Sequence, residues 1–154
     1  MTIYICDDSK SDLLRLNHHL QEYLSHQDQK ITIESFQSGE ELLRRYEETM
    51  EKPSLIFLDI YMDGITGMEA ARRIRNQSDD CILVFVTTSS EFAVESYDVN
   101  AAYYLLKPFQ PEKLCQILDS FRLKEALHAR YIEIISDRVP VRVPLHSILY
   151  ADTF

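Results

Sequence analysis

Glycine is scarce in this chain of 154 residues, which contains only Gly39, Gly64 and Gly67. A dinucleotide-binding fingerprint needs a Gly-x-Gly-x-x-Gly run, and a phosphate-binding P-loop needs a Gly-x-x-x-x-Gly-Lys run. Neither spacing occurs in the sequence. We therefore exclude the ordinary glycine-rich nucleotide sites.

Cysteine is also rare, and Cys6, Cys81 and Cys115 lie far apart, each within an apolar stretch. No pair has the spacing of zinc ligands, and an odd number of distant cysteines does not indicate a disulfide framework. We expect each of them to be a buried, reduced thiol.

Long apolar runs are missing as well. A membrane-spanning helix needs about 20 predominantly apolar residues, and no uninterrupted run in the sequence approaches that length. Asp7 and Asp8 interrupt the apolar start of the chain too early for a signal peptide. These absences predict a cytoplasmic protein without a membrane partner.

Positive charge is in deficit, with 16 basic residues against 25 acidic residues and a formal net charge of −9. Proteins that hold nucleic acid or anionic membranes through their whole surface need clustered lysine and arginine. The charge balance argues against that kind of binding, whereas it permits cations and basic partners.

Five short apolar runs alternate with amphipathic helical patterns over the first 125 residues. We expect strands at residues 3–6, 31–36, 55–58, 81–86 and 103–106. Ser9, Ser38 and Thr66 are each followed three residues later by an acid, which predicts a helix start with a capping box. This alternation predicts an α/β fold, in which helices cover both faces of a parallel sheet. Right-handed crossovers then bring all carboxyl ends of the strands to one edge, where ligands bind in such folds.

The last two predicted helices differ in length. The helix between the fourth and fifth strands is expected over residues 91–98, with Phe92, Ala93 and Tyr97 facing inward. Pro111 suits the first turn of the final helix.

The pattern changes after about residue 129, where no helical stripe continues. We expect short strands at 131–135, 139–143 and 148–150. Pro140 and Pro144 interrupt this segment, which suits edge strands better than central ones. The sequence thus predicts a compact domain at 1–125 and a short C-terminal β-rich extension at 126–154.

The residues at the predicted strand ends are Asp7-Asp8, Asp59, Thr87 and Lys107. Two like charges about 4 Å apart repel by about 4 kcal/mol at an effective dielectric constant of about 20, so three carboxylates at one edge call for a cation. Mg²⁺ binds one or two carboxylates and leaves room for a phosphate oxygen. Thr87 can donate a hydrogen bond to a phosphoryl oxygen, and Lys107 supplies a compact positive charge. The set therefore predicts phosphoryl transfer to a carboxylate.

Four motifs carry a resemblance to a known family: Ile5-Cys6-Asp7-Asp8, Leu58-Asp59-Ile60-Tyr61-Met62-Asp63-Gly64, Phe85-Val86-Thr87-Thr88 and Tyr104-Leu105-Leu106-Lys107-Pro108-Phe109. In their order and separations they resemble the receiver domain of two-component response regulators, over about residues 1–125. The resemblance implies a flavodoxin-like, doubly wound sheet of five parallel strands in the order 2-1-3-4-5. It also implies a signalling phosphoacceptor that takes part in its own phosphorylation and dephosphorylation, rather than an enzyme.

The resemblance implies roles for the acidic residues of the site. Asp59 is the expected phosphoacceptor, and a sensor histidine kinase is the expected donor. Asp7, Asp8 and Asp59 are expected to hold Mg²⁺, with the backbone carbonyl of Tyr61 completing the site.

The resemblance also implies roles at the fourth and fifth strands. Thr87 and Lys107 are expected to assist the transfer, and Thr87 with Tyr104 to form the switch pair. A cis peptide bond is expected between Lys107 and Pro108. After phosphorylation, the surface of the fourth helix, fifth strand and fifth helix is expected to form a homodimer.

The chain departs from the family pattern at three positions. Asp63 stands where the family usually has proline, so we expect this loop to carry a free backbone N–H and to be more mobile. Thr88 stands where alanine is frequent, and Tyr103 where an acid is frequent. These departures bear on the rigidity of the loop and the lifetime of the phosphoryl group.

The segment from Val141 to Tyr150 resembles the opening strands of LytTR-type DNA-binding domains. The residues of the receiver motifs are also typical of LytTR-type regulators. We expect 126–154 to be a linker and the truncated first strands of such a domain. Its three arginines and three acids cancel in charge. Promoter DNA is therefore expected to bind only through the complete C-terminal domain of a full-length protein.

Two other classes of function remain open. An interaction module with this fold could be regulated without phosphate. An aspartyl-phosphate phosphatase of the haloacid-dehalogenase type would need a second aspartate two positions after the nucleophile, where this chain has Tyr61.

Overall fold

The computed structural model describes residues 1–129, 131–136 and 139–144, with side chains described up to residue 122. The chain divides into two compact units, Met1–Pro111 and Glu112–Phe154. The strand predicted at 148–150 lies outside the described residues.

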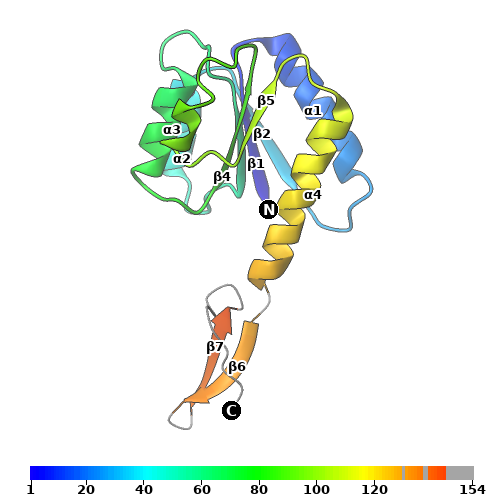
Figure 1. The fold of residues 1–154 in the computed structure, drawn as a ribbon, viewed down its shortest axis with the longest axis vertical. Helices are drawn as coiled ribbons and strands as arrows, with labels where there is room; N and C mark the ends of the chain where they lie inside the picture. The colour runs from blue at the N-terminus through cyan, green and yellow to red at the C-terminus, as the bar shows by residue number, and fades with distance from the viewer. Residues whose placement is uncertain (130, 137–138, 145–154) are drawn as a thin grey trace. The chain divides into compact units, whose positions relative to one another are not determined.

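The first unit is built on a five-stranded sheet in the order β2-β1-β3-β4-β5, and every neighbouring pair is parallel (Figure 1). The predicted flavodoxin-like topology is confirmed. The strands are β1 (Thr2–Cys6), β2 (Thr32–Phe36), β3 (Leu55–Leu58), β4 (Ile82–Thr87) and β5 (Tyr103–Leu106). β3 is buried along its whole length, as are all residues of β4 after the first, because helices cover the sheet on both sides.

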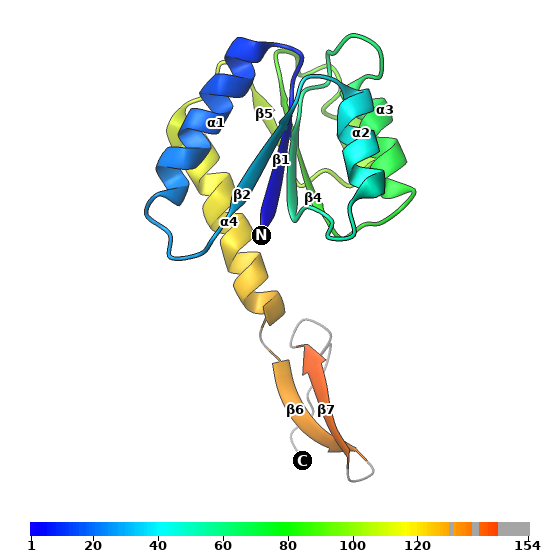
Figure 2. The same cartoon turned by 180° about the vertical axis from the view of Figure 1, so that it is seen from behind.

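The helices of the first unit begin where the caps predict. The side chains of Ser9, Ser38 and Thr66 accept hydrogen bonds from backbone N–H groups three residues later, which satisfies one of the free donors at each helix start. These caps open α1 (Lys10–Leu24), α2 (Gly39–Glu48) and α3 (Gly67–Arg75). α2 and α3 lie side by side on one face of the sheet, and α1 lies on the other (Figure 1, Figure 2).

Gly67 allows α3 to begin directly against the end of β3. A Cβ atom at this position would lie only 2.0 Å from the backbone oxygen of Asp59. The Gly67 N–H instead donates to the carbonyl of Ile60 at 2.9 Å. Only glycine fits this close approach, which fixes the path of the backbone around Asp59.

The prediction of a helix over residues 91–98 with Tyr97 facing inward is wrong, whereas Phe92 is partly buried against the core as expected. Residues 91–94 form turns, and a single 3₁₀ turn, η1, covers Glu95–Tyr97. Ser96 donates its hydroxyl to the carbonyl of Ala93 at 2.6 Å, and such local bonds compete with an α-helix. Because a 3₁₀ turn places residues three apart on one face, Val94 and Tyr97 point outward together, 79% and 81% exposed.

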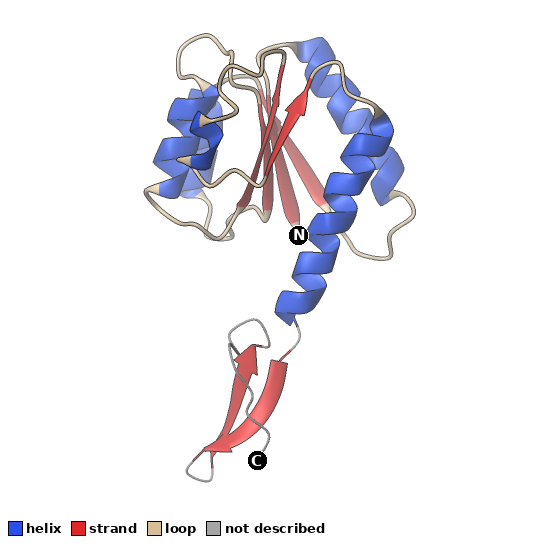
Figure 3. Cartoon of the chain, viewed as in Figure 1, coloured by secondary structure: helices blue, strands red, loops and turns tan. Residues whose placement is uncertain are grey.

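The second unit contains α4 and an antiparallel hairpin (Figure 3). α4 runs over Pro111–Ala129, and its first residue is the proline that the sequence placed there. The apolar side chains of Leu114, Ile117, Leu118 and Phe121 on this helix are buried. The hairpin strands are β6 (Tyr131–Ser136) and β7 (Val139–Pro144), each one residue longer than predicted. Within the described residues, no helix is both long and apolar enough to cross a membrane.

Candidate functional site

The carboxyl ends of the parallel strands bring the predicted residues to one edge of the sheet. Backbone hydrogen bonds continue just past the strands: Asp59 N–H donates to Cys6, and Lys107 N–H donates to Thr87. Asp7, Asp59 and Thr87 are all buried at this edge. The sheet register thus places together side chains that lie up to 100 residues apart in sequence.

The acid cluster consists of Asp7, Asp8, Asp12 and Asp59 together with Lys107. Carboxylate oxygens of Asp7, Asp8 and Asp59 lie within 4.8 Å of one another. Asp8 is exposed while the other two are buried, so the group opens to solvent on the Asp8 side. Three hard oxygen donors this close to one another fit a small dication such as Mg²⁺.

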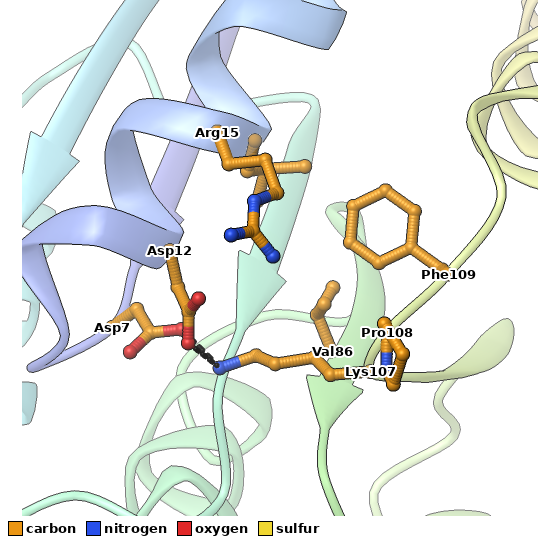
Figure 4. Close-up of a pocket in the computed structure, with 8 residues that line it drawn as sticks. Asp7, Asp12, Arg15, Val86, Lys107, Pro108 and Phe109 are labelled. Carbon is orange, nitrogen blue, oxygen red and sulfur yellow. Dashed lines mark hydrogen bonds and ion pairs between the residues drawn. The ribbon is translucent and has the colours of Figure 1, made fainter.

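Lys107 lies at the centre of the acid cluster. Its ammonium nitrogen lies 2.5 Å from Asp7 Oδ2, 3.0 Å from Asp12 Oδ2 and 3.3 Å from Asp59 Oδ2. Figure 4 shows Asp7 and Asp12 converging on this ammonium, beside a cavity of about 40 Å³ that Arg15 and Phe109 also line. The peptide bond between Lys107 and Pro108 is cis.

Charge and burial act in opposite directions on two groups of the acid cluster. Burial raises the pKa of Asp7 above its ordinary value, although hydrogen bonds from Lys107 and from the Ser9 amide oppose the rise. Burial would lower the pKa of Lys107, but hydrogen bonds to Asp7 and Asp12 and the charge of Asp59 together raise it. Lys107 is therefore a permanent cation within the cluster.

Asp12 is a site residue that sequence reasoning missed. Its backbone N–H donates to Ser9 Oγ at 3.4 Å, as the predicted capping box requires. A capping box also predicts that the Asp12 carboxylate accepts the Ser9 N–H, and this is wrong. The Asp12 carboxylate pairs with Lys107, and Asp7 accepts the Ser9 N–H at 2.8 Å. A neighbouring ammonium is a stronger partner for a carboxylate than a backbone amide. The only signal in the sequence was an acidic residue in the first turn of the helix that follows β1.

The hydroxyl region of the site consists of Thr87, Tyr104 and Tyr61. Thr87 Oγ1 is fully buried and has no hydrogen-bond partner among the described residues. Tyr104 is half-buried, and its hydroxyl donates to the carbonyl of Ser89 at 2.5 Å. Tyr61 donates its hydroxyl to Glu91 at 2.7 Å and its backbone N–H to Asp59 Oδ1 at 3.3 Å.

The chain matches the family model described as response regulator receiver domain over residues 3–119. It is 40% identical to the sensory transduction protein LytT of Oceanobacillus iheyensis over 94 residues, which are 59% of this chain and 37% of the relative. It is 32% identical to the positive alginate biosynthesis regulatory protein of Pseudomonas aeruginosa over 121 residues, 77% of this chain and 46% of the relative. The chain therefore spans less than half the length of these curated relatives.

Solved structures show the same likeness. The response regulatory domain of mrkE from Klebsiella pneumoniae has a TM-score of 0.70 at 27% identity and covers 80% of this chain and 97% of its own. The response regulator TrrA of Thermotoga maritima, solved in complex with Mg²⁺ and BeF, has a TM-score of 0.67 at 27% identity, covering 78% and 97%. The family model matches far more than half of the chain, and its residues include the whole acid cluster. This chain belongs to the receiver domain family of two-component response regulators.

Proposed function

We propose that this chain accepts a phosphoryl group on Asp59 from a sensor histidine kinase, in a reaction that depends on Mg²⁺. The observation that carries the proposal is the contact of one ammonium, Lys107 Nζ, with the carboxylates of Asp7, Asp12 and Asp59. A carboxylate held beside a fixed cation and a set of metal-binding oxygens is suited to receive a phosphoryl group.

Asp7, Asp8 and Asp59 would hold the cation, with the backbone carbonyl of Tyr61 as a further ligand. Their oxygens already lie within 4.8 Å of one another. When bound, Mg²⁺ supplies positive charge to the oxygens of the incoming phosphoryl group. Because Asp8 is the exposed member, the cation and its water molecules would enter from that side.

In the transfer, an oxygen of Asp59 forms a bond to phosphorus while the phosphorus–nitrogen bond of the kinase phosphohistidine breaks. The electron pair of the broken bond stays on the imidazole, which then takes up a proton. Lys107 stabilises the negative charge on the moving phosphoryl oxygens. Asp7 and Asp12 hold Lys107 in place for this role.

The phosphoryl group would then provide a hydrogen-bond acceptor for the Thr87 hydroxyl. The buried Thr87 hydroxyl has no partner within the described part of the chain, and it can donate a hydrogen bond to a phosphoryl oxygen. As Thr87 moves toward Asp59, we propose that Tyr104 turns further inward and gives up its bond to the Ser89 carbonyl. This local change would alter the exposed surface of β5 and of residues 91–98.

We propose that the altered surface forms a homodimer in the cytoplasm. The part of the expected dimer surface that lies in the first unit includes the outward-pointing Val94 and Tyr97. We also propose that residues 1–125 are the receiver domain and that residues 126–154 begin a LytTR-type DNA-binding domain, in keeping with the β6–β7 hairpin. Promoter DNA would bind only through the complete domain of the full-length protein.

The test is phosphorylation of the purified chain by a small phosphodonor such as acetyl phosphate, followed by intact mass measurement. We expect a mass gain of one phosphoryl group with Mg²⁺ present, and none after chelation of the metal. Asp59→Asn should abolish the gain, whereas Asp28→Asn, an exposed acid that precedes β2, should not. Labelling of Asp59→Asn to the same extent would refute the assignment. Absence of Mg²⁺-dependent labelling and of beryllofluoride binding would favour an interaction module regulated without phosphate.

A further inference from the structure

The loop that follows β3 presents a row of backbone amides to carboxylates. The N–H groups of alternate residues 61, 63 and 65 donate in turn to Asp59 Oδ1 at 3.3 Å, Asp8 Oδ2 at 3.2 Å and Glu40 Oε1 at 3.0 Å. The turn between the last two has Gly64 at a φ of +76°. Three acids from three different elements thus fix the path of one loop, and two of them belong to the acid cluster.

The middle donor of this row exists because residue 63 is not a proline. The resemblance to receiver domains implies that Asp63 stands where proline is usual, and proline has no backbone N–H. We expected the loop to be more mobile at this position. In the structure, the Asp63 amide donates to Asp8, the exposed member of the three acids that could hold a metal ion.

We propose that the backbone N–H of Asp63 positions the Asp8 carboxylate for the cation, so that this chain uses an amide to orient a metal ligand where its family usually has a proline ring. The inference rests on the proposed Mg²⁺ site. Asp63 is a positioning residue, since it acts through Asp8 and not on the phosphoryl group itself.

The physical reason lies in the exposure of Asp8. Lys107 pairs with Asp7, Asp12 and Asp59, whereas the partner found for Asp8 is the Asp63 amide. An exposed carboxylate without a fixed partner samples several rotamers, and ordering it on cation binding costs conformational entropy. A hydrogen bond to Oδ2 holds the group in one orientation and leaves Oδ1 for the metal. It also partly offsets the repulsion from Asp7 and Asp59.

The test compares two variants that both lose the Asp63 carboxylate. Asp63→Pro also loses the N–H, whereas Asp63→Ala keeps it. We expect Asp63→Pro to bind Mg²⁺ about three- to tenfold more weakly than Asp63→Ala in isothermal titration calorimetry, the range of one net hydrogen bond. Thermal unfolding of both variants without Mg²⁺ tests whether the proline harms the fold.

A second measurement tests the hydrogen bond itself without any metal. The NMR chemical shift of the residue 63 amide proton reports on this bond. When Asp8→Ala is added to Asp63→Ala, the amide proton should shift upfield, as expected for a weaker hydrogen bond. The inference is overturned if this proton does not respond, or if Asp63→Pro binds Mg²⁺ as tightly as Asp63→Ala. If the wild-type chain binds no Mg²⁺ at all, the proposed function fails first, so the two failures can be told apart.

Discussion

The acid cluster and the hydroxyl region share one edge of the same sheet, but their polar groups are satisfied to different degrees. In the acid cluster, every carboxylate has a partner: Lys107 contacts three of them, and the Asp63 amide contacts Asp8. In the hydroxyl region, Tyr104 and Tyr61 have partners, but Thr87 Oγ1 is buried and has none among the side chains described up to residue 122. The site thus joins carboxylates that each have a hydrogen-bond partner to a buried hydroxyl that has none among the residues the structure describes.

The difference separates two tasks. A network in which every carboxylate has a hydrogen-bond partner keeps its geometry, because any movement would leave a buried polar group without one. A buried hydroxyl without a partner destabilises the resting state by about 1–3 kcal/mol, and a new acceptor would recover that energy. The acid cluster is therefore suited to holding a cation and a phosphoryl group, and Thr87 is suited to responding to them.

Breaking the acid cluster should have the largest effect. Lys107→Ala leaves three carboxylates without their cation, and we expect the free energy of unfolding to fall by about 3 kcal/mol at neutral pH. Added Mg²⁺ should restore part of the loss, because it replaces the missing positive charge. Denaturant unfolding with and without Mg²⁺ measures both effects. Lys10→Ala, an exposed lysine on α1, is the matched control, and a similar stability of the two variants would contradict the account.

Removing the polar group of Thr87 should raise the stability of the chain, whereas removing that of Lys107 should lower it. Thr87→Val removes a buried hydroxyl for which the described residues offer no partner, and we expect the resting chain to gain about 1 kcal/mol in unfolding free energy. Thr66→Val removes a hydroxyl that caps α3, and we expect a loss of about 1 kcal/mol. Thermal or denaturant unfolding of the two variants decides the comparison. A loss of stability in both would mean that Thr87 has a partner after all.

A smaller effect concerns pH. Burial raises the pKa of Asp7 in the folded chain, so the folded state binds more protons than the unfolded state between the ordinary pKa and the raised one. The Asp7 contribution to stability is therefore present in acid and is lost as pH rises through that window. We expect the stability of Asp7→Asn relative to the wild type, measured without Mg²⁺, to increase as pH rises through it. A difference between the two that stays constant or falls across this window would contradict the expectation.

The smallest expected effect lies at the exposed rim of the hydroxyl region. A hydrogen bond to Glu91 raises the pKa of Tyr61 above its ordinary value. Glu91→Gln removes the charge, so the pKa of Tyr61 should fall toward that of a free tyrosine. Titration of the Tyr61 ring carbon by NMR measures the change. Glu95→Gln, whose carboxylate lies near Arg72 instead, should leave the Tyr61 titration where it is.

Much of this arrangement follows from sequence alone. Apolar strands that end in Asp7, Asp59, Thr87 and Lys107 predict a parallel sheet. They also predict the edge at which these side chains meet, because all strands of a parallel sheet have their carboxyl ends at the same edge. Helix starts were equally readable from their caps. The family motifs added the roles of the same residues.

Other features depended on contacts that a sequence does not encode locally. Asp12 satisfies a capping pattern, and its choice of Lys107 over an amide depends on a residue 95 positions away. Residues 91–98 carry apolar side chains at a helical spacing, but Ser96 bonds locally and the segment is too short for an α-helix to propagate. The contact of the Asp63 amide with Asp8 depends on how the loop folds over β1 and β3.

The most direct test of the account follows Thr87 and Tyr104 by NMR while Mg²⁺ and beryllofluoride, a stand-in for the phosphoryl group, are added to the full chain. We predict that the signals of both residues shift in the wild type only when Mg²⁺ is present, and that neither shifts in Asp59→Asn. Signals that stay in place in the wild type, or that shift equally in Asp59→Asn, would contradict the claim that the acid cluster receives a phosphoryl group and Thr87 responds to it.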